Sequence, residues 1–238
     1  MRKLSEVLKV ENLDAGYGAL KVLSDINLVI KERQAVVIIG SNGSGKTTLL
    51  HTITGLIRPY RGRIIYKGEE ITHLPPHKKA TKGIAFSRGT VFDSLTVSEN
   101  LDIGTYLSRN VKKTTPTNVF ELFPVLRSRL NQKAGSLSGG ERVMLSIAKA
   151  LVSNPDLLIL DEPSAGLMPK VTLTLIDLFE KLKNEQKLSF LMAEQNVRMI
   201  KGFADYIYVL SHGRTVYSGG AQEILADEQM LRKAYLGI

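Results

Sequence analysis

Residues 40–47 are the part of the sequence that most narrows what this chain can fold into. They read Gly-Ser-Asn-Gly-Ser-Gly-Lys-Thr, which matches the phosphate-loop pattern G-x-x-x-x-G-K-[ST]. The pattern carries weight only between a strand and a helix. Residues 35–39 form a continuous, mostly β-branched run typical of a strand buried on both faces, and residues 48–56 are expected to form a helix. The segment therefore predicts a strand, a phosphate-binding loop and a helix, in that order.

The chemistry of phosphate binding explains the spacing of this loop. Glycines let the backbone curl so that successive N–H groups point at phosphate oxygens, and the following helix adds its positive N-terminal end. Lys46 can bridge the β- and γ-phosphates of a nucleotide, the Thr47 hydroxyl can bind Mg²⁺, and Thr48 lies where the α-phosphate would be. The alternative is an accidental glycine-rich turn, which the flanking strand and helix argue against.

A second signal is an acidic pair at the end of another apolar run. Residues 157–160 are Leu-Leu-Ile-Leu, and Asp161 and Glu162 follow them. The carboxyl ends of parallel strands are where such sheets bind ligands. Asp161 would hold Mg²⁺ directly or through water, and Glu162 would polarise the attacking water as a general base. An acidic pair alone can also cap a helix, and the phosphate loop favours the catalytic interpretation.

A third signal is Leu-Ser-Gly-Gly-Glu at residues 137–141, which precedes an amphipathic pattern over residues 139–151. One interpretation is a serine N-cap followed by flexible glycines. The other is a second helix N-terminus that contacts phosphate. Both can hold at once, because a capped N-terminus still presents free backbone N–H groups.

Elsewhere the chain alternates short strands with helical patterns, which implies an α/β core. Residues 94–133 differ, since they combine helical spacing, more charge and two prolines, and they predict a small inserted helical subdomain. The other strands are expected at residues 8–10, 26–30, 63–66, 157–160, 188–192 and 206–210, and the other helices at 139–151 and 171–183.

The formal net charge of the 238 residues is +9. Such a charge fits a solvated basic surface, or an acidic partner such as nucleotide, nucleic acid or a membrane face. In the basic cluster at residues 108–133 no aromatic residue is interleaved at a spacing typical of nucleic-acid binding, so charge alone selects none of these. No apolar run approaches the ~18 residues of a membrane span, no signal peptide is evident, and we expect an intracellular location. Residues 108–133 hold a local excess, in which one acid, Glu121, faces Arg109, Lys112, Lys113, Arg127, Arg129 and Lys133.

In combination, the phosphate loop, the Leu-Ser-Gly-Gly-Glu motif and the Asp-Glu pair resemble the ABC ATPase family, over essentially the whole chain. The resemblance implies an α/β fold with a phosphate-loop (RecA-like) core, an antiparallel β subdomain contributed mostly by the first third, and the inserted helical subdomain. It places the β subdomain and the phosphate-loop half of the core in residues 1–92, the helical subdomain in 93–135, and the rest of the core in 136–238. The implied reaction is Mg²⁺-dependent hydrolysis of ATP to ADP and phosphate.

The resemblance also implies a dimer in which the signature motif of one subunit closes over the ATP held by the other. Ser138 and Gly140 would contact the partner's γ-phosphate, Tyr17 would stack on adenine, and residues 164–167 would cross the interface. Glu162 and Gln195 are the implied catalytic residues, and Thr47 and Asp161 the metal ligands. The implied nucleotide-binding residues are Tyr17, Gly40, Ser41, Asn42, Gly43, Ser44, Gly45, Lys46, Thr47, Thr48, Ser138, Gly139 and Gly140.

Shorter motifs resemble importer ATPases for branched-chain amino acids, especially the second of their two ATPase subunits, and urea and amide importers share much of this pattern. These motifs lie at residues 74–77, 95–101, 121–124, 194–196 and 234–237. The implied partners are membrane permease subunits, a second ATPase subunit or a second copy of this chain, and indirectly an extracytoplasmic solute-binding protein. The implied location is cytoplasmic, on the inner face of the cell membrane, with no direct binding of nucleic acid.

Two positions depart from the family pattern. Gln195 stands where most members have the γ-phosphate-sensing His, and glutamine can donate a hydrogen bond but carries no charge. The family's Q-loop glutamine falls on Ser87 when residues 91–92 anchor the comparison, and the segment is about two residues short when residues 83–85 anchor it. Two alternatives therefore stay open: a cytosolic ABC ATPase acting on nucleic acid or ribosomes, and a module that binds ATP but hydrolyses it weakly.

Overall fold

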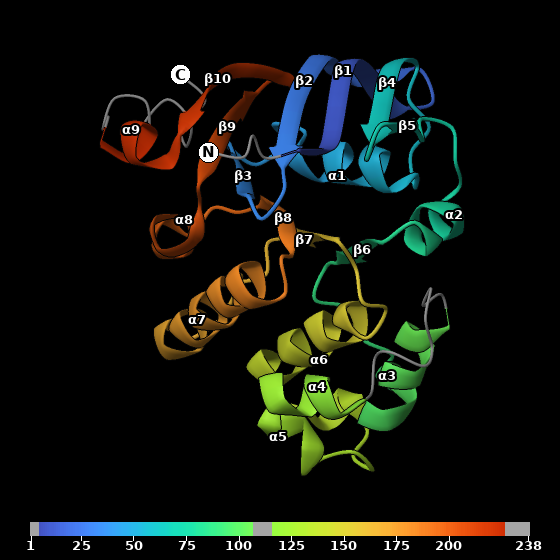
Figure 1. Cartoon of the computed structure of the whole chain (residues 1–238), viewed down its shortest axis with the longest axis vertical. Helices are drawn as coiled ribbons and strands as arrows, with labels where there is room; N and C mark the ends of the chain where they lie inside the picture. Colours follow the sequence, from blue (N-terminus) through green and yellow to red (C-terminus); the bar gives the residue numbers. More distant parts are fainter. Residues whose placement is uncertain (1–4, 107–115, 227–238) are drawn as a thin grey trace.

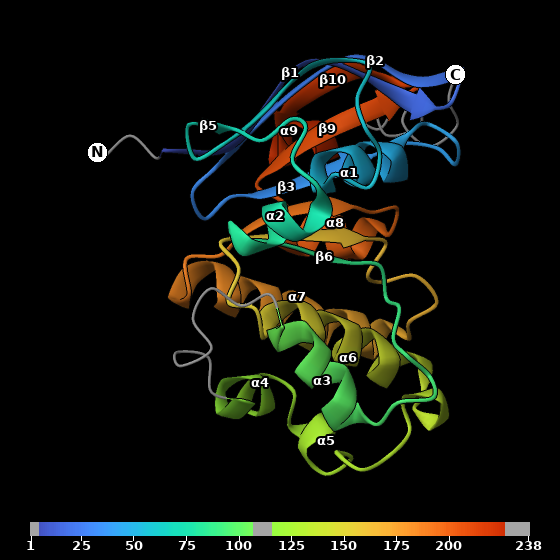
Figure 2. The ribbon, with the colours of Figure 1, turned by 90° about the vertical axis from the view of Figure 1, so that its right-hand side faces the viewer.

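The computed structural model describes residues 5–106 and 116–226, and its architecture confirms the predicted α/β fold class. An antiparallel sheet lies above a larger, mainly parallel sheet, and helices form the layers beneath (Figures 1 and 2). The basic residues Arg109, Lys112 and Lys113 and the motif at residues 234–237 lie outside the described residues. None of the described helices combines the length and apolar character needed to cross a bilayer.

The antiparallel sheet comes from the first third of the chain, as predicted. Its strand order is β2-β1-β4-β5. The two long strands exceed the predicted stretches 8–10 and 26–30, because their pairing continues through several register shifts that the apolar pattern does not follow. The strands are β1 (Glu6–Tyr17), β2 (Leu20–Lys31), β4 (Arg61–Tyr66) and β5 (Glu69–Glu70).

The larger sheet has the strand order β10-β9-β3-β8-β7-β6 and is parallel except for the β9–β10 pair. Every residue of its three central strands β3, β8 and β7 is buried, which is why these strands are continuous apolar runs. The sequence did not predict β6 or β10. The strands are β3 (Ala35–Ile39), β6 (Ile84–Ser87), β7 (Leu157–Asp161), β8 (Ser189–Ala193), β9 (Tyr206–Ser211) and β10 (Arg214–Gly220).

Helix α1 (Lys46–Thr54) begins two residues before the predicted residue 48, so Lys46 and Thr47 lie in its first turn. Its N-cap Gly45 (φ 106°) and C-cap Gly55 (φ 86°) both adopt the left-handed conformation that glycine favours. The other helices are α2 (Pro76–Thr81), α3 (Val97–Thr105), α4 (Pro116–Leu122), α5 (Pro124–Arg127), a 3₁₀ turn (Ala134–Ser136), α6 (Gly139–Leu151), α7 (Pro169–Glu185), α8 (Val197–Phe203) and α9 (Ala221–Ala226).

Two hydrophobic clusters cover the two faces of the larger sheet. In β3, Val36 and Ile38 face the cluster shared with α1 and the antiparallel sheet, while Val37 faces the cluster shared with α6, α7 and α8. Figure 2 shows this layering, with α1 above the sheet and α6 and α7 below it. Because hydrophobic side chains pack against both faces of β3, the loop that follows this strand begins at a rigid position.

Helices α3, α4 and α5 all lie within the predicted helical segment, residues 93–135. They reach the rest of the fold through α6, against which α3 packs. Val97 of α3 and Leu126 of α5 belong to the same hydrophobic cluster as sheet residues such as Leu160. The division of the chain into residues 1–92, 93–135 and 136–238 stays a prediction, since one hydrophobic cluster includes residues from all three parts.

Candidate nucleotide-binding and hydrolysis site

The glycine-rich loop between β3 and α1 is shaped by close contacts with its neighbours. A Cβ on Gly40 would lie 2.2 Å from the backbone oxygen of Leu210 in β9, so only glycine fits there. Gly43 has φ 80°, which also favours glycine and turns the chain back toward the helix. The loop therefore leaves the carboxyl end of β3 and returns directly into the first turn of α1.

The polar groups of this loop are arranged to receive an anion. Lys46 is buried and its Nζ donates to the carbonyl oxygens of Gly40 (2.9 Å) and Ser41 (3.1 Å). Burial lowers the pKa of this lysine, against the opposing effect of nearby carboxylates. Within the described residues, Ser44 Oγ is a buried atom without a hydrogen-bond partner. A buried hydroxyl without a partner is rare in folded proteins, and a phosphate oxygen would satisfy it.

The predicted metal ligands lie in contact with each other. Asp161 is the last residue of β7, and the Thr47 hydroxyl lies 3.1 Å from its Oδ2 and 3.3 Å from its Oδ1. Burial of the Asp161 carboxyl raises its pKa. Among the described residues no group of three or more His, Cys, Asp or Glu side chains could hold a metal ion. A magnesium ion held by Thr47 and Asp161 would take its remaining ligands from phosphate oxygens and water, as Mg²⁺ commonly does.

The predicted catalytic residues also lie together. Gln195, two residues after the end of β8, donates from Nε2 to Glu162 Oε1 (2.6 Å) and to Asn42 Oδ1 (2.9 Å). Glu162 directly follows β7 and has a left-handed backbone (φ 49°), fixed by a hydrogen bond from its N–H to the Ala193 carbonyl (2.9 Å). The loops that follow β3, β7 and β8 therefore meet at one edge of the sheet.

Glu194 is a residue of this site that the sequence reasoning used only as part of a motif. Its side chain is buried, and Oε2 accepts hydrogen bonds from the Ser164 backbone N–H (3.2 Å) and hydroxyl (2.9 Å). Oε1 accepts from the backbone N–H groups of Gln195 (2.8 Å) and Asn196 (2.9 Å). One carboxylate thus joins the loop after β7 to the loop after β8.

The segment after β6 places Arg88, and not Ser87, beside the acidic edge. The Ser87 hydroxyl is buried and lies 2.8 Å from the Ser146 hydroxyl of α6, within the interior. Arg88 Nε lies 3.4 Å from Asp161 Oδ2. The sequence comparison missed Arg88 because the short segment left its register open, and the contact with Asp161 decides which residue reaches the site.

Tyr17 is the last residue of β1 and is half exposed, so one face of its ring is accessible. The turn that carries it is held by Tyr60, whose hydroxyl donates to the Gly18 carbonyl (2.8 Å). A side chain of the adjacent strand, Leu23, lies where a Cβ on Gly45 would collide with it at 2.7 Å. Strand β2, which follows the turn, therefore passes next to the phosphate loop.

The signature motif at 137–141 does not join this cluster. Ser138 caps α6: its hydroxyl accepts from the Glu141 N–H (3.4 Å) and donates to Glu141 Oε2 (2.8 Å). Arg129 pairs with the other oxygen of Glu141 (2.9 Å). In the part of the chain that the structure describes, no hydrogen bond connects residues 138–140 with residues 40–48. Residues 40–48, 161, 162 and 195 are therefore brought together, and residues 138–140 are held apart from them.

A buried strand, a glycine-rich loop and a helix, with an acidic strand end beside them, define this molecule as a phosphate-loop nucleotide-binding protein. The chain belongs to the ABC transporter family. The family model described as "ABC transporter" matches residues 23–165. It binds ATP and is an ATPase of that family.

Curated relatives resemble the chain over nearly its full length. The probable branched-chain amino acid transport ATP-binding protein LivF of Archaeoglobus fulgidus is 41% identical, with 98% of this chain and 99% of that protein covered. The high-affinity branched-chain amino acid transport ATP-binding protein BraG of Pseudomonas aeruginosa is 39% identical, with 97% and 100% covered. The probable branched-chain amino acid transport ATP-binding protein LivG of Archaeoglobus fulgidus is 31% identical, with 98% and 96% covered.

Solved structures agree with these relatives. A nucleotide-free ATP-binding cassette from an ABC transporter superposes with a TM-score of 0.85 at 27% identity, covering 95% of this chain and 98% of that one. The ADP conformation of MJ1267, an ATP-binding cassette of an ABC transporter, superposes with a TM-score of 0.86 at 28% identity, covering 98% and 100%. Together the comparisons favour a transporter ATPase over a nucleic-acid-acting ATPase or a module that only binds nucleotide.

Proposed function

We propose that this chain is the ATPase subunit of an importer for branched-chain amino acids or a related small polar solute such as urea or an amide. The observation that carries the proposal is the meeting of the phosphate loop, Asp161, Glu162 and Gln195 at one sheet edge. The names of the relatives supply the solute class. On this proposal the chain works on the cytoplasmic, inner face of the cell membrane, beside a permease that an extracytoplasmic solute-binding protein serves.

We assign the phosphates of ATP to the loop between β3 and α1. The backbone N–H groups of residues 40–48 and the unpartnered Ser44 hydroxyl would donate to phosphate oxygens. Lys46 would exchange the carbonyls of Gly40 and Ser41 for the β- and γ-phosphates, which compensate its charge better than neutral carbonyls do. The exposed ring of Tyr17 would stack on adenine.

Thr47 and Asp161 are the proposed holders of Mg²⁺, which when bound supplies positive charge against the β- and γ-phosphates. The donor set fits, because a hydroxyl and a carboxylate are the oxygen ligands that Mg²⁺ prefers. Glu162 is the proposed general base that accepts a proton from the attacking water. Gln195 holds the Glu162 carboxylate through its amide and, being neutral at every pH, neither gains nor releases a proton.

A second ATPase subunit is needed on this proposal, because residues 138–140 lie apart from the chain's own phosphate loop. We assign Ser138, Gly139 and Gly140 to the nucleotide held by the partner. The comparisons favour a different partner chain: Archaeoglobus fulgidus has two such ATP-binding proteins, LivF and LivG, and this chain is more similar to LivF. A second copy of this chain remains the alternative partner.

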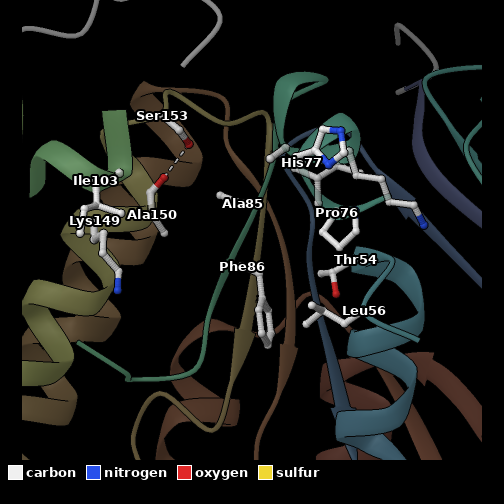
Figure 3. A pocket seen from close by; sticks show the side chains of 14 residues that line it. Thr54, Leu56, Pro76, His77, Ala85, Phe86, Ile103, Lys149, Ala150 and Ser153 are labelled. Atoms are coloured by element: carbon white, nitrogen blue, oxygen red, sulfur yellow. Dashed lines mark hydrogen bonds between the residues drawn. The ribbon is translucent and has the colours of Figure 1, made fainter. Parts of the chain in front are cut away.

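The permease is proposed to dock in a groove between the helical layer and the core (Figure 3). The groove has a volume of about 450 Å³. In Figure 3, Leu56 and His77 stand on one side, Ile103 and Lys149 on the other, and Phe86 of β6 between them. Lys149 also donates to the Thr90 carbonyl (2.9 Å), which links the groove wall to the segment after β6. A cytoplasmic permease helix with apolar side chains and an acidic residue facing Lys149 fits this lining.

The test of the nucleotide assignment is Lys46→Ala, for which calorimetry should show loss of measurable Mg²⁺–ATP binding. The variant removes the cation between the phosphates, and because it also removes two hydrogen bonds to loop carbonyls, circular dichroism checks that the variant folds. Lys82→Ala, at a partly buried lysine paired with Glu69 away from the loop, is the matched control and should bind ATP like the wild type. Unchanged ATP affinity in Lys46→Ala would refute the assignment of the phosphate loop.

The test of the permease assignment uses the groove. In membranes that contain the cognate permease, Ile103→Glu should abolish solute-stimulated ATPase activity while ATP binding by the purified chain stays normal. Leu173→Glu, which changes an equally exposed apolar residue of α7 outside the groove, is the control. Equal losses from both variants would show that the groove has no special role in coupling.

A further inference from the structure

Asp161 carries a charge that needs a counterpart. Its side chain is only 4% exposed, and among the described residues the one neutral hydrogen-bond donor to it is the Thr47 hydroxyl at 3.1 Å. A buried carboxylate is costly unless a cation or several donors compensate it. The charge of Lys46 also acts on Asp161, but the Lys46 Nζ donates its hydrogen bonds to the carbonyls of Gly40 and Ser41.

Arg88 is the cation that faces this carboxylate. It is the first residue after β6, and the parallel pairing of β6 with β7 brings it alongside Asp161. Its Nε lies 3.4 Å from Asp161 Oδ2, while the side chain is 56% exposed. A guanidinium stays charged at any pH the protein meets, so this pairing does not switch off by deprotonation. The high exposure and the following Gly89 (φ 70°) leave the side chain room to move away.

The same carboxylate is the proposed ligand of Mg²⁺, and it cannot serve two cations equally well. Two positive charges within a few ångströms repel each other strongly in a site that is only partly open to water. We propose that Arg88 is a metal-competing cation: it compensates Asp161 in the nucleotide-free site, and Mg²⁺–ATP displaces it. The inference rests on the proposed function of Asp161 and extends it to a residue outside the expected site.

The displacement would reach the permease groove by a short path. Ala85 and Phe86, in the strand that ends just before Arg88, line the groove. On the other side of Arg88, the Thr90 carbonyl accepts a hydrogen bond from Lys149, which also lines the groove. Movement of the Arg88 segment on binding of Mg²⁺–ATP therefore changes a wall of the docking surface. The groove and the metal-competing Arg88 share one stretch of backbone, residues 84–90.

The experiment compares ATP affinity in excess Mg²⁺ with ATP affinity in excess EDTA, by titration calorimetry of the purified full-length chain. In the wild type, Arg88 offsets Asp161 when the metal is absent, so EDTA should weaken ATP binding only modestly. In Arg88→Ala, Asp161 faces the phosphates uncompensated in EDTA and is open to the metal in Mg²⁺. The ratio of the two dissociation constants should therefore rise at least tenfold in Arg88→Ala.

Two further variants keep the test specific. Arg88→Lys retains the charge, and its ratio should stay within threefold of the wild type. Arg63→Ala removes an arginine that pairs with Glu11 in the antiparallel sheet and should leave the ratio unchanged. Melting curves without nucleotide check that all four proteins fold, and Arg88→Ala should melt at a lower temperature than the other three because it leaves the buried Asp161 carboxylate uncompensated.

The outcomes separate this inference from the function on which it rests. A wild-type chain that binds no ATP in either condition refutes the proposed nucleotide site itself. ATP binding by the wild type with an unchanged ratio in Arg88→Ala overturns the role of Arg88 alone. The role is also overturned if a folded Arg88→Ala variant loses ATP in both conditions, or if Arg88→Lys behaves like Arg88→Ala, because neither result follows from competition between charges.

Discussion

At the scale of single residues, the site depends on side chains whose neighbours determine their state. Glu162 is fixed on a left-handed backbone and accepts a hydrogen bond from Gln195 at 2.6 Å. A carboxylate held in this way is positioned to accept a proton from water, whereas a carboxylate that only capped a helix would bond to backbone N–H groups. The two interpretations of Glu162, general base and helix cap, therefore predict different effects on hydrolysis when its negative charge is removed.

We expect Glu162→Gln to keep ATP binding and to lower turnover by about 10²–10⁴, the usual contribution of a positioned general base. The variant should also accumulate as an ATP-bound dimer, because hydrolysis is proposed to open the dimer. Single-turnover hydrolysis and size-exclusion chromatography with ATP measure the two effects. Glu185→Gln, at the C-terminal end of α7, is the control. Wild-type turnover in Glu162→Gln would leave this residue a structural role only.

Sequence reasoning found the residues whose spacing is set by their chemistry. The loop 40–47 could be recognised because phosphate binding requires glycines and a lysine at fixed intervals. Arg88 and Glu194 could not be found in this way, since their partners, Asp161 and Ser164, are far away in the sequence. Their importance depends on strand pairing, which no local pattern reports.

At the scale of elements, α1 is stabilised at both ends by unusual groups. Its first turn carries the proposed phosphate ligands, and the buried Lys79 of α2 donates to the carbonyl of Ile53 (2.9 Å) near its C-terminus. A cation at a helix C-terminus compensates the free carbonyls and the negative end of the helix dipole. The N-terminal end of α1 thus faces the proposed anion site, and its C-terminal end faces the cation of Lys79.

The burial of Lys79 predicts a pH-dependent stability. Burial lowers the pKa of Lys79 from 10.5 to about 8, so the unfolded chain binds more protons than the folded chain between those values. The free energy of unfolding attributable to Lys79 should therefore rise as the pH increases from 8 to 10.5, by up to about 3 kcal/mol. Lys79→Met should lose this rise, and urea denaturation at several pH values measures the difference. Lys82→Met is the matched control and should keep the rise. If the stability of Lys79→Met depends on pH as the wild type does, the prediction is wrong.

Which elements could be predicted depended on how far they are buried. The strands β3, β7 and β8 were predicted nearly to the residue, because each is a fully buried apolar run. Strand β10 was missed because most of its residues are exposed and polar or glycine, and β6 because it is a short strand at the other edge of the sheet. The apolar pattern of β10 is weak because this strand buries few side chains, whereas β6 is mostly buried but only four residues long.

At the scale of the whole molecule, one chain contributes different parts to two proposed sites. Its own site has a neutral Gln195, and Ser87, which the sequence comparison placed at the Q-loop position, is buried in the interior. Its signature motif, in contrast, keeps the full Leu-Ser-Gly-Gly-Glu sequence and exposes Ser138 and Gly139. We therefore expect slow hydrolysis at this chain's own site and a normal contribution to the partner's site.

The asymmetry can be measured in the heterodimer by comparing two variants of this chain, Lys46→Ala and Ser138→Arg. The first disables the chain's own site and the second blocks the partner's site, so Ser138→Arg should cause the larger loss of total ATPase activity. Donors that act on the transition state are often worth about 2.7–4 kcal/mol, enough for a clear difference. Ser136→Arg, at an exposed serine just before the motif, is the control. Equal losses from Lys46→Ala and Ser138→Arg would refute the asymmetry.

The buried carboxylate of Glu194 has a consequence for the local opening of the two loops that it joins. Because its two oxygens hold the backbone N–H groups of Ser164, Gln195 and Asn196, these three amides share one anchor. In native-state hydrogen exchange they should open together, with one common protection factor, rather than as two independent loops. Glu194→Gln leaves one oxygen and should split them into two groups that exchange at different rates, which mass spectrometry of peptides covering each loop would resolve. A loop that responds to the γ-phosphate and a loop proposed to reach the partner would then share a single opening event, so each subunit would report its nucleotide state across the dimer as one cooperative unit.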